Sequence, residues 1–140
     1  MNRFARYLLP LTAAAMLAGC GIKESYEQTG AEVAQFHTAL DGEKYEAIWK
    51  GASPEMRKAA SQQQLTTLLE AVHRKLGKVK DTKQVGWNSN ATTEGSFVTV
   101  TMQTTFERGS GTEAITFIKG DDDRLSLVGY TIQSQDMMVN

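Results

Sequence analysis

The chain has 140 residues, of which 41% are hydrophobic, and its 15 lysines and arginines nearly balance 16 aspartates and glutamates, giving a net charge of -1. This length suits one ordinary domain and is too short for two. The charge balance provides no basic footprint for a nucleic-acid backbone, so we expect no nucleic-acid partner. A single cysteine excludes an internal disulfide and a cysteine zinc site.

Residues 1–19 have the composition of a secretory signal peptide. Arg3 and Arg6 precede an uncharged apolar stretch at residues 7–18. That stretch is shorter than the ~20 residues that a membrane-spanning helix needs. We therefore predict a signal peptide that is removed, and no permanent transmembrane helix.

The end of this segment resembles the lipobox of bacterial lipoproteins, because Cys20 directly follows Leu17, Ala18 and Gly19. The resemblance implies cleavage before Cys20 and attachment of acyl chains, such as palmitate, to this cysteine. Several acyl chains on one residue anchor a protein stably in a membrane. In such lipoproteins an aspartate after the cysteine favours the inner membrane, and Gly21 stands at that position. The resemblance therefore implies that the protein is located at the periplasmic face of the outer membrane.

The segment after the cysteine is polar and contains two glycines, Gly21 and Gly30. Such composition is typical of flexible linkers. We expect residues 20–30 to be an acylated tether and residues 31–140 to form a single domain.

Two segments near the start of this domain show helical periodicity. In residues 31–40, Val33, Phe36, His37 and Leu40 fall on one stripe of a 3.6-residue helix. A second, short helix is predicted at residues 44–50.

Two further helices are marked by capping signals. Ser53 followed by Pro54 indicates an N-cap and a first helical position. Ser61 and Gln64 have the spacing of a capping box for a helix with an unbroken apolar stripe. Gly77 is the expected C-cap of that helix.

After Gly77 the apolar period changes from 3.6 to 2. We predict strands at residues 79–87, 97–108, 112–119 and 125–133, with hairpin turns at residues 109–111 and 120–123. Helices followed by antiparallel strands indicate an α+β domain, with N-terminal helices packed on one face of a curved four-stranded sheet. The predicted inward face of the second strand consists of Val98, Val100, Met102, Thr104 and Phe106.

This order of elements resembles the nuclear-transport-factor-two-like fold, also called the cystatin-like α+β cone. Residues 31–61, the helix end LLEAVHRKLGKV, Gly86-Trp87-Asn88, residues 106–109 and Val128-Gly129-Tyr130 are also similar to a family of small bacterial lipoproteins. That family is a domain of unknown function. The resemblance implies a fold and a location, and it transfers no catalytic residue.

The strands offer few groups for catalysis. Enzymes of this general fold need a carboxylate base and an acidic donor that face each other inside an apolar cone. Among the inward strand positions, Glu113 is the one acid, and it stands at the start of its strand. The hydroxyl of Tyr130 either points into a cavity or is satisfied within the core. We predict no enzyme and no catalytic residue.

The remaining polar signals favour solvated or structural roles. We expect His37 to be a core-edge histidine with one hydrogen bond and His73 to be a boundary residue. The histidines lack metal-ligand spacing, so no metal and no cofactor are predicted. Asp121, Asp122 and Asp123 fit a solvated hairpin tip. A basic cluster follows the longest helix: Arg74, Lys75, Lys78, Lys80 and Lys83.

A group of large side chains has two interpretations that the pattern leaves open. These residues either pack between helices and sheet or line a small-molecule pocket. They are Phe36, Trp49, Trp87, Met102 and Tyr130.

These observations predict a lipid-anchored envelope protein that acts as a non-enzymatic binding or accessory module. Its partners would be the membrane, through Cys20, and an unidentified protein or small ligand. An alternative is an inhibitor or immunity lipoprotein that inserts the tip at residues 121–123 into a cell-wall-acting enzyme. A further alternative is a small-molecule enzyme that uses Tyr130 with a carboxylate from a helix.

Overall fold

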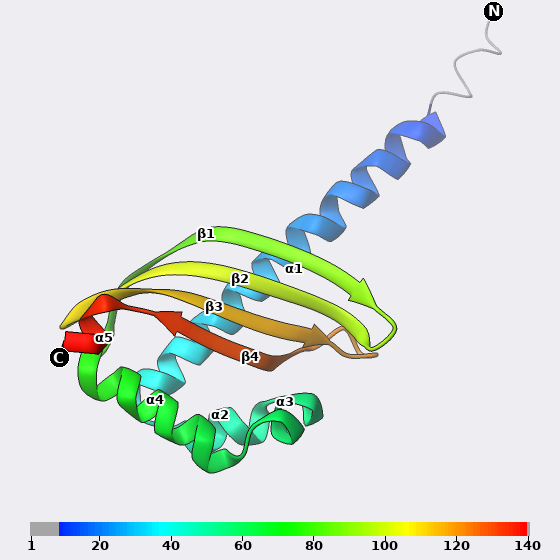
Figure 1. Cartoon of the computed structure of the whole chain (residues 1–140). Coiled ribbons are helices and arrows are strands. Elements are labelled where there is room, and N and C mark those ends of the chain that lie inside the picture. The colour runs from blue at the N-terminus through cyan, green and yellow to red at the C-terminus, as the bar shows by residue number, and fades with distance from the viewer. Residues whose placement is uncertain (1–8, 140) are drawn as a thin grey trace, which may run out of the picture.

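The computed structural model describes the backbone of residues 9–139 and the side chains of residues 25–139. Helices pack on one face of a curved antiparallel sheet whose strands follow in the order β1-β2-β3-β4 (Figure 1). The prediction of an α+β domain with helices before a four-stranded meander is confirmed. The predicted signal peptide begins outside the described residues.

Five helices and four strands are described. The helices are α1 (Leu9–Asp41), α2 (Tyr45–Gly51), α3 (Pro54–Ala59), α4 (Gln62–Leu76) and α5 (Gln135–Val139). The strands are β1 (Val79–Thr92), β2 (Gly95–Phe106), β3 (Gly109–Lys119) and β4 (Leu125–Gln133).

The predicted helix caps are confirmed. The Ser53 hydroxyl accepts a hydrogen bond from the Met56 amide at 3.1 Å and begins α3. Ser61 and Gln64 exchange both bonds of a capping box at the start of α4. Gly77 ends α4 with a φ of 81°, a left-handed conformation that glycine adopts at little cost.

The core lies between the sheet and the helices. Every predicted inward position of β2 is buried, as the alternation indicated. Leu69, Val72 and Leu76 of α4 and Leu40 of α1 have no exposed surface. Burying each such aliphatic side chain contributes about 1.5–3 kcal/mol before conformational entropy is counted.

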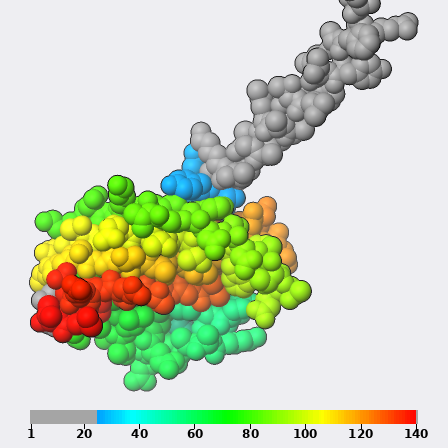
Figure 2. All heavy atoms as spheres, turned by 45° about the horizontal axis from the view of Figure 1, so that its top comes forward, coloured from blue at the N-terminus to red at the C-terminus, as the bar shows by residue number. Residues whose placement is uncertain are grey.

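The segment expected to be a flexible tether is helical. α1 runs without interruption through residues 20–30. The Thr29 side chain is fully buried, and the Gln28 side-chain amide donates to the Asp123 carbonyl at 2.9 Å. The end of the segment that composition assigned to a linker thus belongs to the folded body. Figure 2 shows the first described side chains of α1, in blue, against the rim of the body.

The hairpin between β2 and β3 turns earlier than predicted. Glu107 and Arg108 form the turn, and Gly109 and Gly111 lie within β3. These glycines provide space instead of a turn: a Cβ on Gly109 would stand 2.6 Å from the Cβ of Asp136. Gly109 therefore allows α5 to pack closely over the hairpin, and Gly111 makes room for Ile132 of the neighbouring β4.

β1 extends beyond the predicted end at Trp87. Asn88 pairs with Thr99, and the ladder continues to Thr92 opposite Gly95. The polar residues after Trp87 gave no strand pattern because the end of β1 is exposed on both faces.

No helix among the described residues combines the length and the apolar character required to span a membrane.

Candidate functional site

β3 places a carboxylate inside the domain. Glu113, Ile115 and Phe117 are every second residue of β3, so they lie on one face of the strand, and all three are buried. Glu113 has no exposed surface. An isolated charge in such a place is very costly, so its partners decide what it does.

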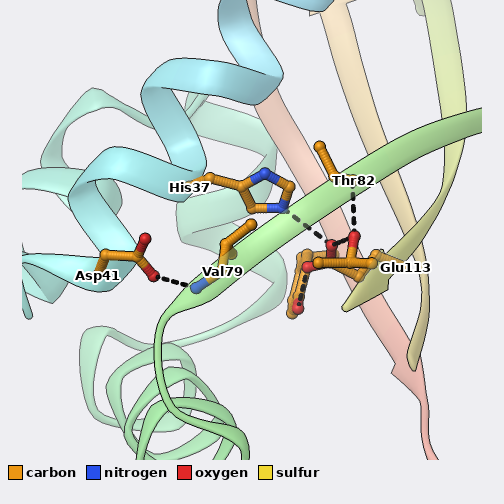
Figure 3. A network of polar contacts seen from close by, with 7 residues as sticks. His37, Asp41, Val79, Thr82 and Glu113 are labelled. Carbon is orange, nitrogen blue, oxygen red and sulfur yellow. Dashed lines mark hydrogen bonds and ion pairs between the residues drawn. The ribbon is translucent and has the colours of Figure 1, made fainter. Parts of the chain in front are cut away.

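Three side chains from three different elements donate to Glu113 (Figure 3). His37 Nε2 of α1 lies 2.8 Å from Oε1, and Thr104 Oγ1 of β2 lies 2.5 Å from the same oxygen. The Tyr130 hydroxyl of β4 lies 2.7 Å from Oε2. Since an ionised carboxylate only accepts, His37 carries a proton on Nε2. We call these four residues the Glu113 cluster.

The cluster extends toward the surface through one more hydroxyl. Thr82 Oγ1 of β1 lies 2.7 Å from Thr104 Oγ1. Because Thr104 gives its only hydroxyl proton to Glu113, the hydroxyl of the half-buried Thr82 must be the donor to Thr104. The network therefore connects α1 with all four strands.

One helical turn after His37, α1 makes another polar contact with the sheet, this time with β1. Asp41 Oδ1 accepts from the Val79 amide at 3.1 Å (Figure 3). His37 and Asp41 lie on the same side of α1 because they are four residues apart. Together they fix the end of α1 over the sheet.

Opposing effects act on the ionisation of Glu113. Burial would raise the pKa of its carboxyl, but the hydrogen bond and charge of His37 lower it, as do the bonds from Thr104 and Tyr130. The net result is a pKa below the ordinary value, so Glu113 is ionised near neutral pH. Burial and the neighbouring Glu113 carboxylate raise the pKa of Tyr130, so this phenol stays protonated.

This arrangement resembles catalytic groups in composition but not in access. A general base must reach a substrate proton at about 2.6–3.2 Å. Glu113 has no exposed surface and binds three donors of its own chain. The arrangement therefore fastens α1 to the sheet.

An open pocket lies beside this cluster, between α1, α2 and the strands β3 and β4. Its volume is about 190 Å³. A cavity of 150 Å³ in another protein holds benzene, so the pocket has room for a group of that size. We call it the apolar pocket. Its lining consists of Phe36, Ala39, Ala47, Ile48, Phe117, Leu125 and Leu127, with Glu32, Gln35, Gly51 and Ser126 at the polar side.

The predicted pocket residues do not form one group. Phe36 lines the apolar pocket, and its ring centroid lies 4.9 Å from that of the buried Tyr130. Met102 is buried in the core. Trp49 is half-buried, with its indole N–H 3.5 Å from the Ala60 carbonyl. Trp87 is 36% exposed on β1. Phe36 and Tyr130 are thus the pair that meets.

The two histidines lie in different environments. His37 is buried and has the one hydrogen bond expected of it. His73 is half-buried on α4, with Nε2 4.0 Å from the Glu43 carboxylate and a buried Nδ1 that has no hydrogen-bond partner. Within the described part of the chain, no three histidine, cysteine or acidic side chains gather as a metal site would require.

The sequence indicated Glu113 as an inward acid, but its place at the centre of a polar network was not predicted. The signal was present: Glu113 stands two and four residues before Ile115 and Phe117, which places it on the core face. His37 stands on the apolar stripe of its helix. Two polar residues on core faces of different elements indicate a buried pair.

Comparison with known proteins gives a family and a fold. Residues 32–130 match a family described as "Protein of unknown function (DUF4019)". No curated protein matches the chain.

Two solved structures are similar. A protein of Catenulispora acidiphila aligns with a TM-score of 0.54 and 16% identity, over 85% of this chain and 97% of that one. ActVI-ORFA of Streptomyces coelicolor aligns with a TM-score of 0.51 and 16% identity, over 79% of this chain and 97% of that one. At this identity the likeness concerns the fold alone.

Proposed function

The chain belongs to the DUF4019 family, whose function is unknown, and we propose that it is a lipid-anchored module of the bacterial cell envelope that binds a small apolar group without transforming it. The observation that carries this proposal is the separation of the apolar pocket from the Glu113 cluster. Of the four cluster residues, none lines the pocket. The pocket is therefore suited to binding, while the reactive groups are enclosed.

The lining of the pocket includes small residues with open space beside them. Ala47 is exposed on α2, and a Cβ added to Gly51 would meet nothing within 4 Å. Phe36 and Phe117 supply apolar walls. Such concave, mostly apolar sites with a few polar groups are typical of ligand binding.

The anchor and the pocket share one helix. α1 contains Cys20, the candidate acylation site, and also Gln28, Glu32 and Phe36, which line the pocket or its polar end. The helical rise between Cys20 and Gln28 is about 12 Å. An acylated Cys20 would therefore hold the site close to a membrane, and Gly21 after the cysteine favours the outer membrane. The order of elements resembles the cystatin-like cone, and a ligand site between sheet and helices is compatible with such a fold.

The inhibitor alternative receives less support. The turn that carries the acids is tied to the chain itself: the Gln28 side-chain amide of α1 donates to the backbone carbonyl of Asp123 at 2.9 Å, and the Asp122 carboxylate accepts from the Arg124 amide at 3.1 Å. An inhibitory loop that inserts into a cleft would need to protrude, whereas the bond from Gln28 holds this turn against α1.

Lipidation is tested by metabolic labelling. Cells that express the full chain are grown with radiolabelled palmitate, and we expect the label on the wild-type protein and none on Cys20→Ala. Equal labelling of both proteins would contradict the anchor.

Ligand binding is tested by native mass spectrometry of the full-length protein, extracted from membranes in mild detergent. We expect a reproducible added mass on the wild type that Ala47→Phe removes, because the new ring covers the pocket. Ala34→Phe is the matched control, since Ala34 is exposed on α1 and does not line the pocket. An added mass that persists in Ala47→Phe, or a bare protein throughout, would contradict the proposal.

A further inference from the structure

The apolar pocket continues into a polar depression. Glu32, Gln35, Gly51, Leu125 and Ser126 line both hollows, so the two form one cleft. The polar depression has a volume of about 470 Å³. It adds side chains from the β3–β4 turn, and we call it the polar mouth.

Two carboxylates and one guanidinium line the polar mouth. Glu32 of α1 and Asp122 of the turn are the acids, and Arg124 is the base. Asp121 beside them is exposed, and Asp123 lies 3.6 Å from the Lys119 ammonium. After that pair is set aside, the mouth and its border retain an excess of negative charge.

Glu32 is the acid that lies nearest to the apolar wall, because it lines both hollows and is half-buried. Burial raises the pKa of its carboxyl, and the charge of Arg124 lowers it in part. A partly desolvated carboxylate gains more from a bound cation than an exposed one does. Arg124 is exposed, so water and salt screen its charge more strongly.

The shape of the cleft sets the order of the groups in a ligand. The inner end has room for an apolar group about the size of a benzene ring, with Phe36 and Phe117 as walls. The outer end begins at Glu32. A molecule that fits must therefore join an apolar ring or short branched chain to a polar head within a few bonds.

We propose that this cleft binds a small apolar amine, with its apolar group between Phe36 and Phe117 and its ammonium against Glu32. The proposal rests on the binding role given above and adds the charge of the ligand. The excess of acids in the polar mouth would attract an ammonium group. A carboxylate would be repelled by Glu32 and Asp122 and attracted by Arg124 alone.

The test uses three probes of similar shape and different charge: 2-phenylethylamine, 2-phenylethanol and 3-phenylpropionate. Each is titrated calorimetrically into the full-length protein in detergent, with the heat of empty micelles subtracted. We expect the amine to bind about fivefold more tightly than the alcohol, with the carboxylate the weakest, as a half-exposed ion pair allows.

Two substitutions assign this preference to Glu32. Glu32→Gln should lower the affinity for the amine to that of the alcohol and leave the alcohol unchanged. Glu27→Gln is the matched control, since Glu27 is exposed on α1 and does not line the cleft. Arg124→Gln should strengthen amine binding, because it removes the one opposing cation that lines the mouth.

The outcomes separate the ligand class from the binding role. Equal affinities for the three probes, or tightest binding of the carboxylate, would overturn the amine proposal and leave the binding role standing. An amine preference that survives in Glu32→Gln would overturn the assignment to this cleft. If no probe binds, the amine proposal fails. The binding role is then decided separately by native mass spectrometry of the wild type and Ala47→Phe.

Discussion

The Glu113 cluster and the apolar pocket lie on either side of one side chain. Phe36 packs its ring against Tyr130 and also lines the pocket. On one side a buried carboxylate accepts from three buried side chains, and on the other the lining is mostly apolar and the pocket is open. In this domain the buried charge holds α1 on the sheet, whereas the pocket beside it stays open, and this difference is the basis of the proposed binding role.

Removal of the Glu113 carboxylate should have the largest effect on stability. Glu113→Ala leaves His37, Thr104 and Tyr130 without their acceptor, and losing one member of a buried pair costs about 3–5 kcal/mol. That is a large share of the stability of about 5–15 kcal/mol of a typical domain. Urea denaturation measures the loss.

Glu94→Ala serves as the reference for that experiment, because Glu94 is an exposed residue of the β1–β2 turn. We expect its unfolding free energy to stay within about 0.5 kcal/mol of wild type. A Glu113→Ala protein as stable as Glu94→Ala would show that the cluster does not fasten α1.

Removal of a single donor should have a smaller effect. Tyr130→Phe keeps the ring against Phe36 and deletes the hydroxyl that donates to Glu113 at 2.7 Å. A hydrogen bond to a charged group contributes about 1.5–3 kcal/mol. We expect a loss in that range by urea denaturation, and a ligand affinity that does not change. A changed affinity with unchanged stability would place Tyr130 in the binding site.

The cluster should also make stability depend on pH. The pKa of Glu113 is lowered from 4.5, so its ionised form stabilises the fold above the unfolded pKa, and this stability is lost as pH falls through the folded pKa. The unfolding free energy of wild type should therefore fall on acidification more steeply than that of Glu113→Gln. Equal slopes of the two proteins below about pH 4.5 would contradict ionisation of the buried carboxyl.

The smallest expected effect on stability concerns the pocket. Ala47 is exposed, so Ala47→Phe needs no room in the core and should change the unfolding free energy by less than about 0.5 kcal/mol. The same substitution should abolish ligand binding. A large loss of stability would show that the pocket region is part of the packed core.

Much of the fold was predictable because its signals are local. The caps at Ser53, Ser61 and Gly77 use hydrogen bonds and backbone angles that lie within a few residues, and all three were confirmed. The alternation in β2 predicted its buried face for the same reason. The helical state of residues 20–30 was not predictable, because contacts of Gln28 and Thr29 with the folded body support it.

The glycines after Arg108 show a similar limit. They have the composition of a turn, but Gly109 is needed for the close approach of Asp136, which is distant in sequence. The predicted pocket residues met the same difficulty, since apolar side chains of equal character became core at Met102, a pocket wall at Phe36 and exposed surface at Trp87.

The element order, the helix caps, the inward face of β2 and the candidate lipobox can be read from the amino-acid sequence, because each depends on neighbouring residues. The contacts of Glu113 with His37, Thr104 and Tyr130, and the open pocket beside them, emerge from the packing of the whole domain. These features depend on distances between residues that are far apart in the chain. Such distances are set when the helices and the sheet pack together.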